Sequence, residues 1–370
     1  MEIVLFMFIL LYGALMVFFM LGNLKLKGCI NELEEEVKVS VVVPFRNEEE
    51  NLPTLISCLK KQDFPKQNLE IILVNDQSED GSLKIAEMLL LNLKCKTKLL
   101  SLEATNGKKA AIELGVNEAK GEMILSTDAD CTMGKSWVLT MSKAFVSSGR
   151  SLVLGRVKVN RSGNSFTDLF IKENEALMKA TSGATAMKKP FLSNGANLGY
   201  SKVAFLNSKP YQNNRKTASG DDVFLLHKFK QDAFLNRPYF VLDLEATVCT
   251  DGPASLKEFI HQRIRWLSKS KHYTDADIRI FGVFIFLANL SLVFAFILNC
   301  LGIISLAFLL SLIVFKWAMD FFLLRTAYRQ DTLVGDFLGV TYLTILYPFY
   351  TVSLPLLSLF WKTSWKERKL

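Results

Sequence analysis

The sequence of 370 residues contains little histidine and no closely paired cysteines. Only three His are present, and the six Cys form no C-x-x-C pair. Zinc sites and disulfide frameworks need such clusters. The sequence therefore contains no convincing zinc set, and we expect reduced thiols in a cytosolic domain. The cysteines are Cys29, Cys58, Cys95, Cys131, Cys249 and Cys300.

The sequence also lacks the pattern expected of a nucleic-acid-binding surface. The formal net charge is +8, yet the basic residues form no compact stripe interleaved with aromatic residues. They stand beside apolar segments instead, which favours contact with an anionic membrane surface. Internal repeats and low-complexity segments are absent as well. We therefore predict a membrane-associated chain with no nucleic-acid partner.

An apolar segment opens the chain, with Glu2 as its only charge over residues 1–21. A helix of this length crosses a hydrocarbon core of roughly 30 Å. A cleaved signal peptide is the alternative, but a basic n-region and a clear A-x-A site are both missing. Lys25 and Lys27 follow directly, so the positive-inside rule places the next segment in the cytoplasm. We predict an uncleaved transmembrane anchor over residues 1–24.

Residues 278–361 are the predicted C-terminal transmembrane region. Residues 278–324 are long enough for two spanning helices. The last apolar stretch carries Pro348 and Pro355. A single span there would leave the basic tail, residues 362–370, outside, against the positive-inside rule. A re-entrant or proline-broken hairpin would return the tail to the cytoplasm, and the sequence favours that arrangement.

Between these ends, residues 38–252 alternate between short β-branched runs and helical patterns. Such alternation predicts an α/β domain with a doubly wound sheet. Ligands of these sheets bind outside the carboxyl ends of the strands. The predicted strands are 39–44, 69–74, 98–100, 123–125 and 152–157, and the predicted helices are 52–61, 110–119, 166–180 and 223–229.

Three aspartates follow two of the predicted strands. Asp128 and Asp130 come after the run 123–125, and Asp76 comes after the run 69–74. Two carboxylates one residue apart on a turn can both reach Mg²⁺ or Mn²⁺, which completes its shell with phosphates and water. An ordinary strand-end turn is the alternative reading of D-x-D. We expect the three carboxylates to converge on one crevice.

Five short motifs follow one another along residues 38–270. They are V-V-V-P-F-R-N-E-E (41–49), V-N-D-Q-S-E-D-G-S (74–82), T-D-A-D (127–130), G-D-D (220–222) and Q-R-I-R-W (262–266). Together they resemble the membrane-bound family 2 glycosyltransferases, which include cellulose, chitin and hyaluronan synthases, ceramide glucosyltransferases and bacterial lipid-directed enzymes. The resemblance implies the nucleotide-diphosphosugar transferase (GT-A) fold, a doubly wound mixed sheet, with transmembrane helices at both ends.

The resemblance implies roles on the donor side. Pro44 and Glu48 match the nucleotide-binding strand end, and Asp76 matches the aspartate that contacts uracil or ribose. Lys108 falls where the family often has a basic residue near the nucleotide. Asp76 has an alternative role as a turn residue that caps a helix.

The resemblance also implies a metal pair and a base. Asp128 and Asp130 match the metal-binding aspartates, with Asp128 also near the nucleotide. Asp222 matches the general base, which removes the proton of the attacking hydroxyl. The alternative for Asp222 is a helix cap. Asp221 replaces the family's more usual Glu, which leaves its secondary role open.

Gln262, Arg265 and Trp266 match Q-x-x-R-W, which in relatives lines the acceptor and diphosphate side. Arg265 can bind a diphosphate through its guanidinium fork. Arg265 as an interfacial anchor and Trp266 as a membrane-belt aromatic are the alternatives. The surrounding segment, residues 253–277, is amphipathic and basic, as expected of a helix at the membrane interface. That placement favours a lipid acceptor.

One further segment, residues 193–200, is rich in small residues and can approach a ligand closely. Its polar members shape either an acceptor pocket or an ordinary turn, and the sequence does not choose between them. They are Asn194, Asn197 and Tyr200.

The sequence thus predicts an inverting, metal-dependent transferase that moves a sugar from a UDP-sugar to a lipid or membrane-held glycan acceptor. We expect an integral membrane protein with a cytoplasmic catalytic domain, in a bacterial inner membrane. A processive polysaccharide synthase is one alternative, although four or five hydrophobic passes are few for a polymer channel. A nucleotide-binding scaffold or transporter is another, disfavoured by the sparse charges within the apolar segments.

Overall fold

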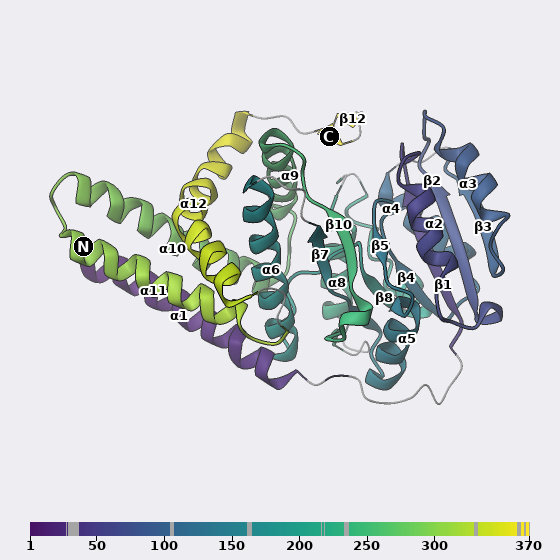
Figure 1. Ribbon diagram of the computed structural model, residues 1–370, viewed down its shortest axis with the longest axis horizontal. Helices are drawn as coiled ribbons and strands as arrows, with labels where there is room; N and C mark the ends of the chain where they lie inside the picture. The colour runs from purple at the N-terminus through teal and green to yellow at the C-terminus, as the bar shows by residue number, and fades with distance from the viewer. Residues whose placement is uncertain are drawn as a thin grey trace. The chain divides into compact units, whose positions relative to one another are not determined.

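A computed structural model describes most of the chain, which divides into two compact units (Figure 1). One unit comprises residues 1–26, 161–191 and 252–363, and the other comprises residues 27–160, 192–251 and 364–370. Lys27, Cys29, Lys362 and Lys366 lie outside the described residues. The described residues are 1–26, 28, 37–103, 107–160, 165–215, 217, 219–232, 237–328, 332–360, 364–365 and 368–369.

The second unit is built on a seven-stranded sheet with the order β3-β2-β1-β4-β8-β6-β9. Strands β1 to β4 run parallel, whereas β8 is antiparallel to both β4 and β6. The predicted mixed sheet is therefore confirmed. The strands are β1 (Val39–Phe45), β2 (Leu69–Asn75), β3 (Lys96–Ser101), β4 (Met123–Ser126), β6 (Leu152–Leu154), β8 (Leu198–Ser201) and β9 (Tyr239–Phe240).

Helices lie on both faces of this sheet, as a doubly wound fold requires. One face packs its buried core residues, such as Val41 and Ile71, against α2 and α5. The opposite face meets α4, where a Cβ on Gly115 would lie 2.5 Å from Val42. Both β1 and β2 are buried at every position, which explains their nearly continuous apolar runs. The helices of this unit are α2 (Leu52–Lys60), α3 (Ser82–Leu90), α4 (Lys108–Glu118), α5 (Trp137–Ser148), α7 (Lys202–Ser208) and α8 (Asp221–Gln231).

The single strand predicted over residues 152–157 is wrong. The chain leaves β6 at Leu154 and enters β7 in a different, three-stranded sheet. Asn197 causes the break: its Nδ2 donates to the Arg156 carbonyl at 2.8 Å, and its carbonyl accepts from Gly155 N at 3.0 Å. A Cβ on Gly155 would overlap the Asn197 side chain. The smaller sheet contains β5 (Thr132–Met133), β10 (Val248–Asp251) and β7 (Val157–Asn160), and the remaining short elements are η1 (Lys66–Asn68), η2 (Leu244–Ala246), β11 (Ser364–Trp365) and β12 (Arg368–Lys369).

Asn197 is fully buried, and its side chain makes three hydrogen bonds to the protein frame. Besides Arg156 O it donates to Ala246 O at 2.7 Å, and it accepts from Trp137 Nε1 at 3.0 Å. These contacts favour the turn interpretation of this residue over an acceptor pocket. We expect Asn197→Ala to lower the unfolding free energy by about 3 kcal/mol or more, because three buried polar groups lose their partner.

Thermal and urea unfolding of the full chain in detergent checks this expectation. Asn194→Ala is the matched control, since Asn194 Oδ1 accepts a single bond, from Ala196 N at 3.1 Å. Equal stability of the two variants would show that the Asn197 bonds do not hold the β6–β7 break in place.

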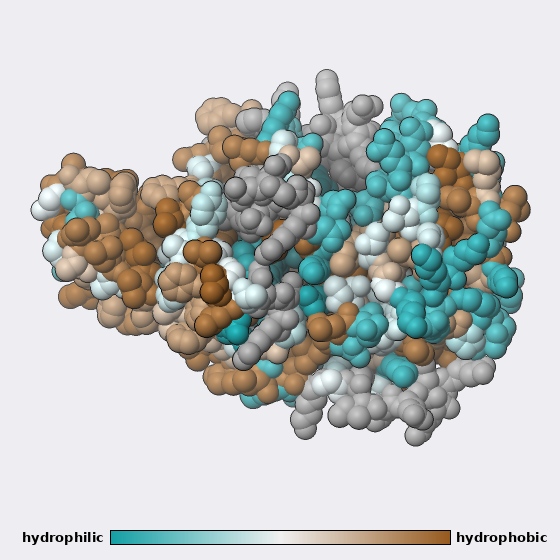
Figure 2. Space-filling view, viewed as in Figure 1, coloured by the Kyte–Doolittle hydropathy of each residue, from teal (hydrophilic) through white to brown (hydrophobic). Residues whose placement is uncertain are grey.

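The first unit is helical. Four of its helices, α1, α10, α11 and α12, are long and apolar enough to cross a membrane. Figure 2 shows hydrophobic residues gathered over α1, α10 and α11, as expected of surfaces that face lipid. The helices of this unit are α1 (Glu2–Lys25), α6 (Ser165–Ala186), α9 (Leu256–Ser270), α10 (Ala276–Cys300), α11 (Leu306–Leu324) and α12 (Leu333–Phe360).

The hairpin predicted for the last apolar stretch does not form. α12 is one helix of 28 residues that continues through Pro348 and Pro355. Apolar helices tolerate proline, because neighbouring helices, Ser and Thr side chains and local adjustments satisfy the freed backbone groups. A proline therefore does not by itself end a helix in this setting.

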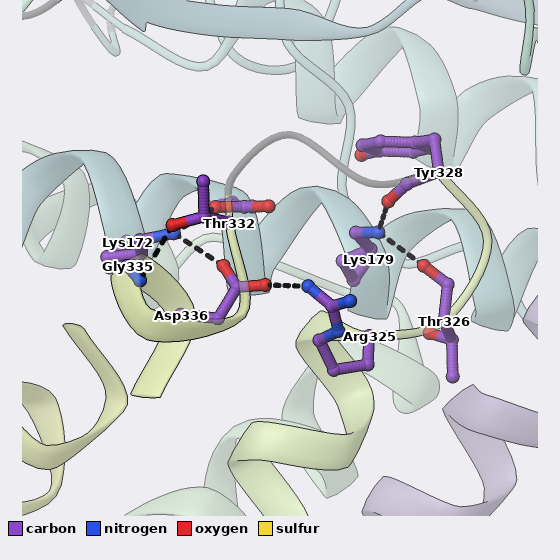
Figure 3. A network of polar contacts seen from close by, with 9 residues as sticks. Lys172, Lys179, Arg325, Thr326, Tyr328, Thr332, Gly335 and Asp336 are labelled. Atoms are coloured by element: carbon purple, nitrogen blue, oxygen red, sulfur yellow. Dashed lines mark hydrogen bonds and ion pairs between the residues drawn. The ribbon is translucent and has the colours of Figure 1, made fainter. Parts of the chain in front are cut away.

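Helix α6 belongs to the helical unit, although the sequence places residues 166–180 in the catalytic domain. Asn23 of α1 donates to the Lys179 carbonyl at 3.0 Å and accepts from Ser182 Oγ at 2.6 Å. Lys179 also donates to two carbonyls beyond the end of α11, those of Thr326 and Tyr328 (Figure 3). The polar face of this amphipathic helix is therefore buried among other helices rather than exposed to water.

A second set of charges ties α6 to α12. Lys172 Nζ lies 2.7 Å from Asp336 and 3.1 Å from Glu175, and Arg325 lies 2.6 Å from the other Asp336 oxygen. Figure 3 shows Asp336 between Lys172 and Arg325. Because both cations share one carboxylate, each buried charge has an opposite charge beside it.

Candidate active site

Lys108, the first residue of α4, lies between carboxylates from two other elements of the sheet unit. Its Nζ is 2.7 Å from Asp128 Oδ1, just after β4, and 3.1 Å from Asp221 Oδ2, at the start of α8. Burial disfavours the charged ammonium, but Asp128, Asp221 and Asp222 outweigh it and hold the pKa of Lys108 well above its ordinary value. Lys108 is therefore a fixed cation at the carboxyl ends of the strands.

Asp76 lies next to this cluster. It follows β2, is buried, and accepts a hydrogen bond from Gly107 N at 2.9 Å. Gly107 immediately precedes Lys108, so the Asp76 carboxylate caps α4 and holds the start of the helix that carries Lys108. The capping role considered for Asp76 is thus present, but at α4 rather than at the helix that follows it in the chain.

Arg46 belongs to the first sequence motif, residues 41–49, but the sequence assigned it no role. It is buried after β1; its Nη1 donates to the carbonyls of Asp76, at 3.0 Å, and of Gln77, and its Nη2 lies 2.6 Å from Glu79. Arg46 therefore ties the loop after β1 to the loop after β2. Aligning the ends of the two parallel strands, where Phe45 pairs with Asn75, would have pointed to it.

Pro44 and Glu48 occupy the end of β1 and the loop beyond it. The pairing of β1 with β4 ends at Val42, so the missing N–H of Pro44 falls beyond that ladder. Glu48 N donates to Ser82 Oγ at 2.7 Å, which joins this loop to the start of α3. The Glu48 carboxylate contributes to the raised pKa of Asp130, after the larger effect of lost water.

Asp128 and Asp130 lie on the turn after β4, as predicted. Loss of water raises the pKa of Asp128, Lys108 opposes this, and Asp130 and Asp221 raise it further. Negative charge is therefore in excess at this turn. Among the described residues no group of three His, Cys, Asp or Glu side chains is placed to hold a metal. Two hard carboxylate donors fit Mg²⁺ or Mn²⁺ if phosphates and water supply the other ligands.

The two aspartates at the start of α8 differ in surroundings. Asp221 is buried and pairs with Lys108, whereas Asp222 is half-buried and accepts from Val223 N at 2.7 Å and Gly195 N at 3.3 Å. A Cβ on Gly195 would lie 2.8 Å from Asp221 Oδ2 and 3.0 Å from Lys108 Nζ, so a larger residue there would displace these side chains. Asp222 lies inside the first turn of α8, whose N-cap is Gly220 without a side-chain cap bond, so the alternative role as a helix cap is wrong.

Gln262, Arg265 and Trp266 stand on α9, in the helical unit. The structure brings together Lys108, the aspartates around it and the loop of Gly195, all within the sheet unit. The three residues of the Q-x-x-R-W motif share one helix of the helical unit.

Comparisons with known proteins bear on the family and the fold of this chain. Residues 40–205 match the family described as glycosyl transferase family 2. A mannosyltransferase, PcManGT from Pyrobaculum calidifontis, solved in complex with GDP-Man and Mn²⁺, has a similar structure. Its TM-score is 0.58 at 15% sequence identity, over 94% of this chain and 98% of that one. The chain therefore carries a family 2 glycosyltransferase domain, and the predicted GT-A fold is confirmed.

Curated relatives match shorter stretches. Glycosyltransferase AglE of Haloferax volcanii is 26% identical over 144 residues, which are 37% of this chain and 47% of that protein. Poly(ribitol-phosphate) β-N-acetylglucosaminyltransferase TarS of Staphylococcus aureus is 34% identical over 118 residues, which are 32% of this chain and 20% of that protein. Undecaprenyl-phosphate 4-deoxy-4-formamido-L-arabinose transferase of Aeromonas hydrophila is 32% identical over 145 residues, which are 39% of this chain and 44% of that protein. The chain thus spans less than half the length of these relatives.

Proposed function

We propose that the protein is an inverting, metal-dependent glycosyltransferase that moves a sugar from a UDP-sugar to a lipid or membrane-held acceptor. The observation that carries this proposal is the convergence on Lys108. Asp128 and Asp221 contact Lys108, Asp222 adds negative charge near it, and Asp76 caps its helix. These side chains come from four segments and meet at the carboxyl ends of the strands, where ligands of such sheets bind.

The donor side comprises Pro44, Glu48, Asp76, Lys108 and Asp128. Asp76 and the end of β1 hold the nucleoside, and the ammonium of Lys108 lies beside the diphosphate. Sugar transfer leaves extra negative charge on that diphosphate, and a fixed cation stabilises it as it develops. A divalent ion held by Asp128 and Asp130 would supply Lewis-acid stabilisation of the phosphate oxygens. The Mn²⁺ in the PcManGT complex supports this assignment.

The acceptor side comprises Asp222 and the motif on α9. Asp222 removes the proton of the attacking hydroxyl, and a single displacement inverts the anomeric carbon. Gln262, Arg265 and Trp266 line the acceptor. α9 is amphipathic and basic, and four other apolar helices fit membrane spans, which supports an acceptor held at the cytoplasmic face of a membrane. The undecaprenyl phosphate named in one relative supports a lipid.

The test is turnover by the full chain in detergent. Radiolabelled UDP-sugars and GDP-mannose are supplied with a membrane-lipid extract and Mn²⁺ or Mg²⁺. We expect one donor to give a labelled lipid, and product length then separates single transfer from polymerisation. Asp63→Asn is the control, because Asp63 is exposed and pairs only across the surface with Lys135 at 3.1 Å. Folded protein that neither transfers nor hydrolyses any donor would refute the proposal.

A further inference from the structure

Arg263 lies inside the Q-R-I-R-W motif, at a position to which the motif assigns no role. Its side chain is 4% exposed, and its Nη2 pairs with Glu173 of α6, which is 6% exposed. The other Glu173 oxygen accepts a hydrogen bond from the hydroxyl of Tyr350 on α12. One carboxylate therefore joins α9 to α6 and α12 inside the helical unit.

Aromatic rings surround the rest of the Arg263 guanidinium. Its Cζ lies 4.9 Å from the ring centroids of Phe170 and Phe259 and 4.4 Å from that of Trp266. Within the described part of the chain, Arg263 Nε and Nη1 have no hydrogen-bond partner. A flat guanidinium fits against ring faces, and the attraction strengthens where water is excluded.

This arrangement is better suited to fixing geometry than to adding stability. Removing an arginine and a glutamate from water is costly, and well-packed apolar residues often stabilise such a position as well or better. The Glu173 carboxylate contacts both Arg263 and the hydroxyl of Tyr350, and these two contacts hold α9 in one rotation about its axis. Trp266, one turn beyond Arg263, is held against the guanidinium, with Lys269 Nζ 6.0 Å from the same ring.

We propose that Arg263 is a positioning residue for sugar transfer. Through Glu173 and Tyr350 it sets the rotation of α9, and through its contact with Trp266 it fixes the orientation of that ring. Gln262, Arg265 and Trp266 are then presented to the acceptor in a single arrangement. The inference rests on the proposed function. Arg263 acts through its neighbours rather than on the substrate.

A second buried ion pair in the same unit provides a matched control. Lys172 adjoins Glu173 in the chain and pairs with Asp336 at 2.7 Å, so it too joins α6 to α12. The side chains of Lys172 and Asp336 are 5% and 1% exposed. Replacing Lys172 and Asp336 removes buried charge between the same two helices, together with their contacts to Glu175 and Arg325, without removing the contact to Trp266.

The experiment measures kcat and the separate donor and acceptor KM values of the full chain, together with thermal unfolding. Arg263→Lys keeps the charge but loses the flat fork, and we expect the acceptor KM to rise about tenfold with the donor KM unchanged. Arg263→Leu combined with Glu173→Leu should recover wild-type thermal stability and keep the raised acceptor KM. Lys172→Met combined with Asp336→Leu should leave both KM values unchanged.

Tyr350→Phe keeps the test valid if the leucine pair does not fold, because it deletes a single hydroxyl. It should raise the acceptor KM about threefold, a fraction of one hydrogen bond to a charged group. An unchanged acceptor KM in Arg263→Lys, or an equal rise in both KM values, would overturn the inference. A folded wild-type protein with no transfer at all would instead refute the proposed function.

Discussion

Asp222→Asn is expected to lower kcat by about 10²–10⁴-fold, because an amide cannot take the proton of the attacking acceptor hydroxyl. The substitution is nearly isosteric, and the amide oxygen can still accept the hydrogen bond from Gly195 N. Donor binding should therefore change little. Single-turnover transfer gives the loss in rate, and calorimetric titration with the nucleoside diphosphate gives the donor affinity.

Asp221→Asn is the matched control, because the two aspartates are adjacent in the chain and both carboxylates raise the pKa of Lys108. Asp221 contacts Lys108 directly, at 3.1 Å, so its loss should weaken donor affinity more than it slows the chemical step. Full transfer by Asp222→Asn together with a large kcat loss in Asp221→Asn would reverse the assignment of the base.

The sequence located this cluster because parallel strands bring their carboxyl ends to one edge. Short apolar runs marked β1, β2 and β4, and the polar residues that followed them were Glu48, Asp76 and Asp128. The sequence could not show which of these side chains contact one another. Which aspartate of G-D-D contacts Lys108, and that Asp76 caps α4, depend on side-chain directions set by tertiary packing.

The errors in the fold have the same cause. Residues 152–157 read as one strand, since the residue that breaks them, Asn197, stands some forty positions later. Periodicity showed that residues 166–180 form an amphipathic helix, but not that its polar face meets Asp336 and the carbonyls after α11. The basic tail together with Pro348 and Pro355 suggested a hairpin. The rule that proline ends a helix comes from water-exposed helices, and it is weaker where other helices supply the surroundings.

Arg263 illustrates a limit of motif reading. The specified letters of Q-x-x-R-W mark residues that are expected to contact substrate. Arg263 occupies one of the unspecified positions between them. Its burial could have been anticipated from its neighbours, Phe259 and Ile264, which lie on the buried side of α9. Its partner Glu173 could not, because that residue belongs to a helix ninety residues earlier.

Loss of the proposed divalent ion is expected to have the other large effect. Asp130→Ala should lower kcat/KM by about 10³-fold, since a divalent cation held there would supply several kcal/mol of charge stabilisation at the diphosphate. Chelation of the wild-type protein with EDTA should have an effect of similar size, reversed by Mn²⁺ or Mg²⁺. Metal binding can be followed without turnover by the loss of the free Mn²⁺ resonance in titrations with and without nucleoside diphosphate.

The reason for this expectation is the charge balance at the turn after β4. Asp128 and Asp130 face Asp221 and Glu48, and Lys108 is the cation that contacts Asp128. Adding a diphosphate brings further negative charge, so donor affinity and metal affinity should each raise the other. Asp243→Ala is the control, because Asp243 is exposed and caps only the short η2 helix. Undiminished transfer by Asp130→Ala, or by wild-type protein in EDTA, would mean that Lys108 alone neutralises the leaving group.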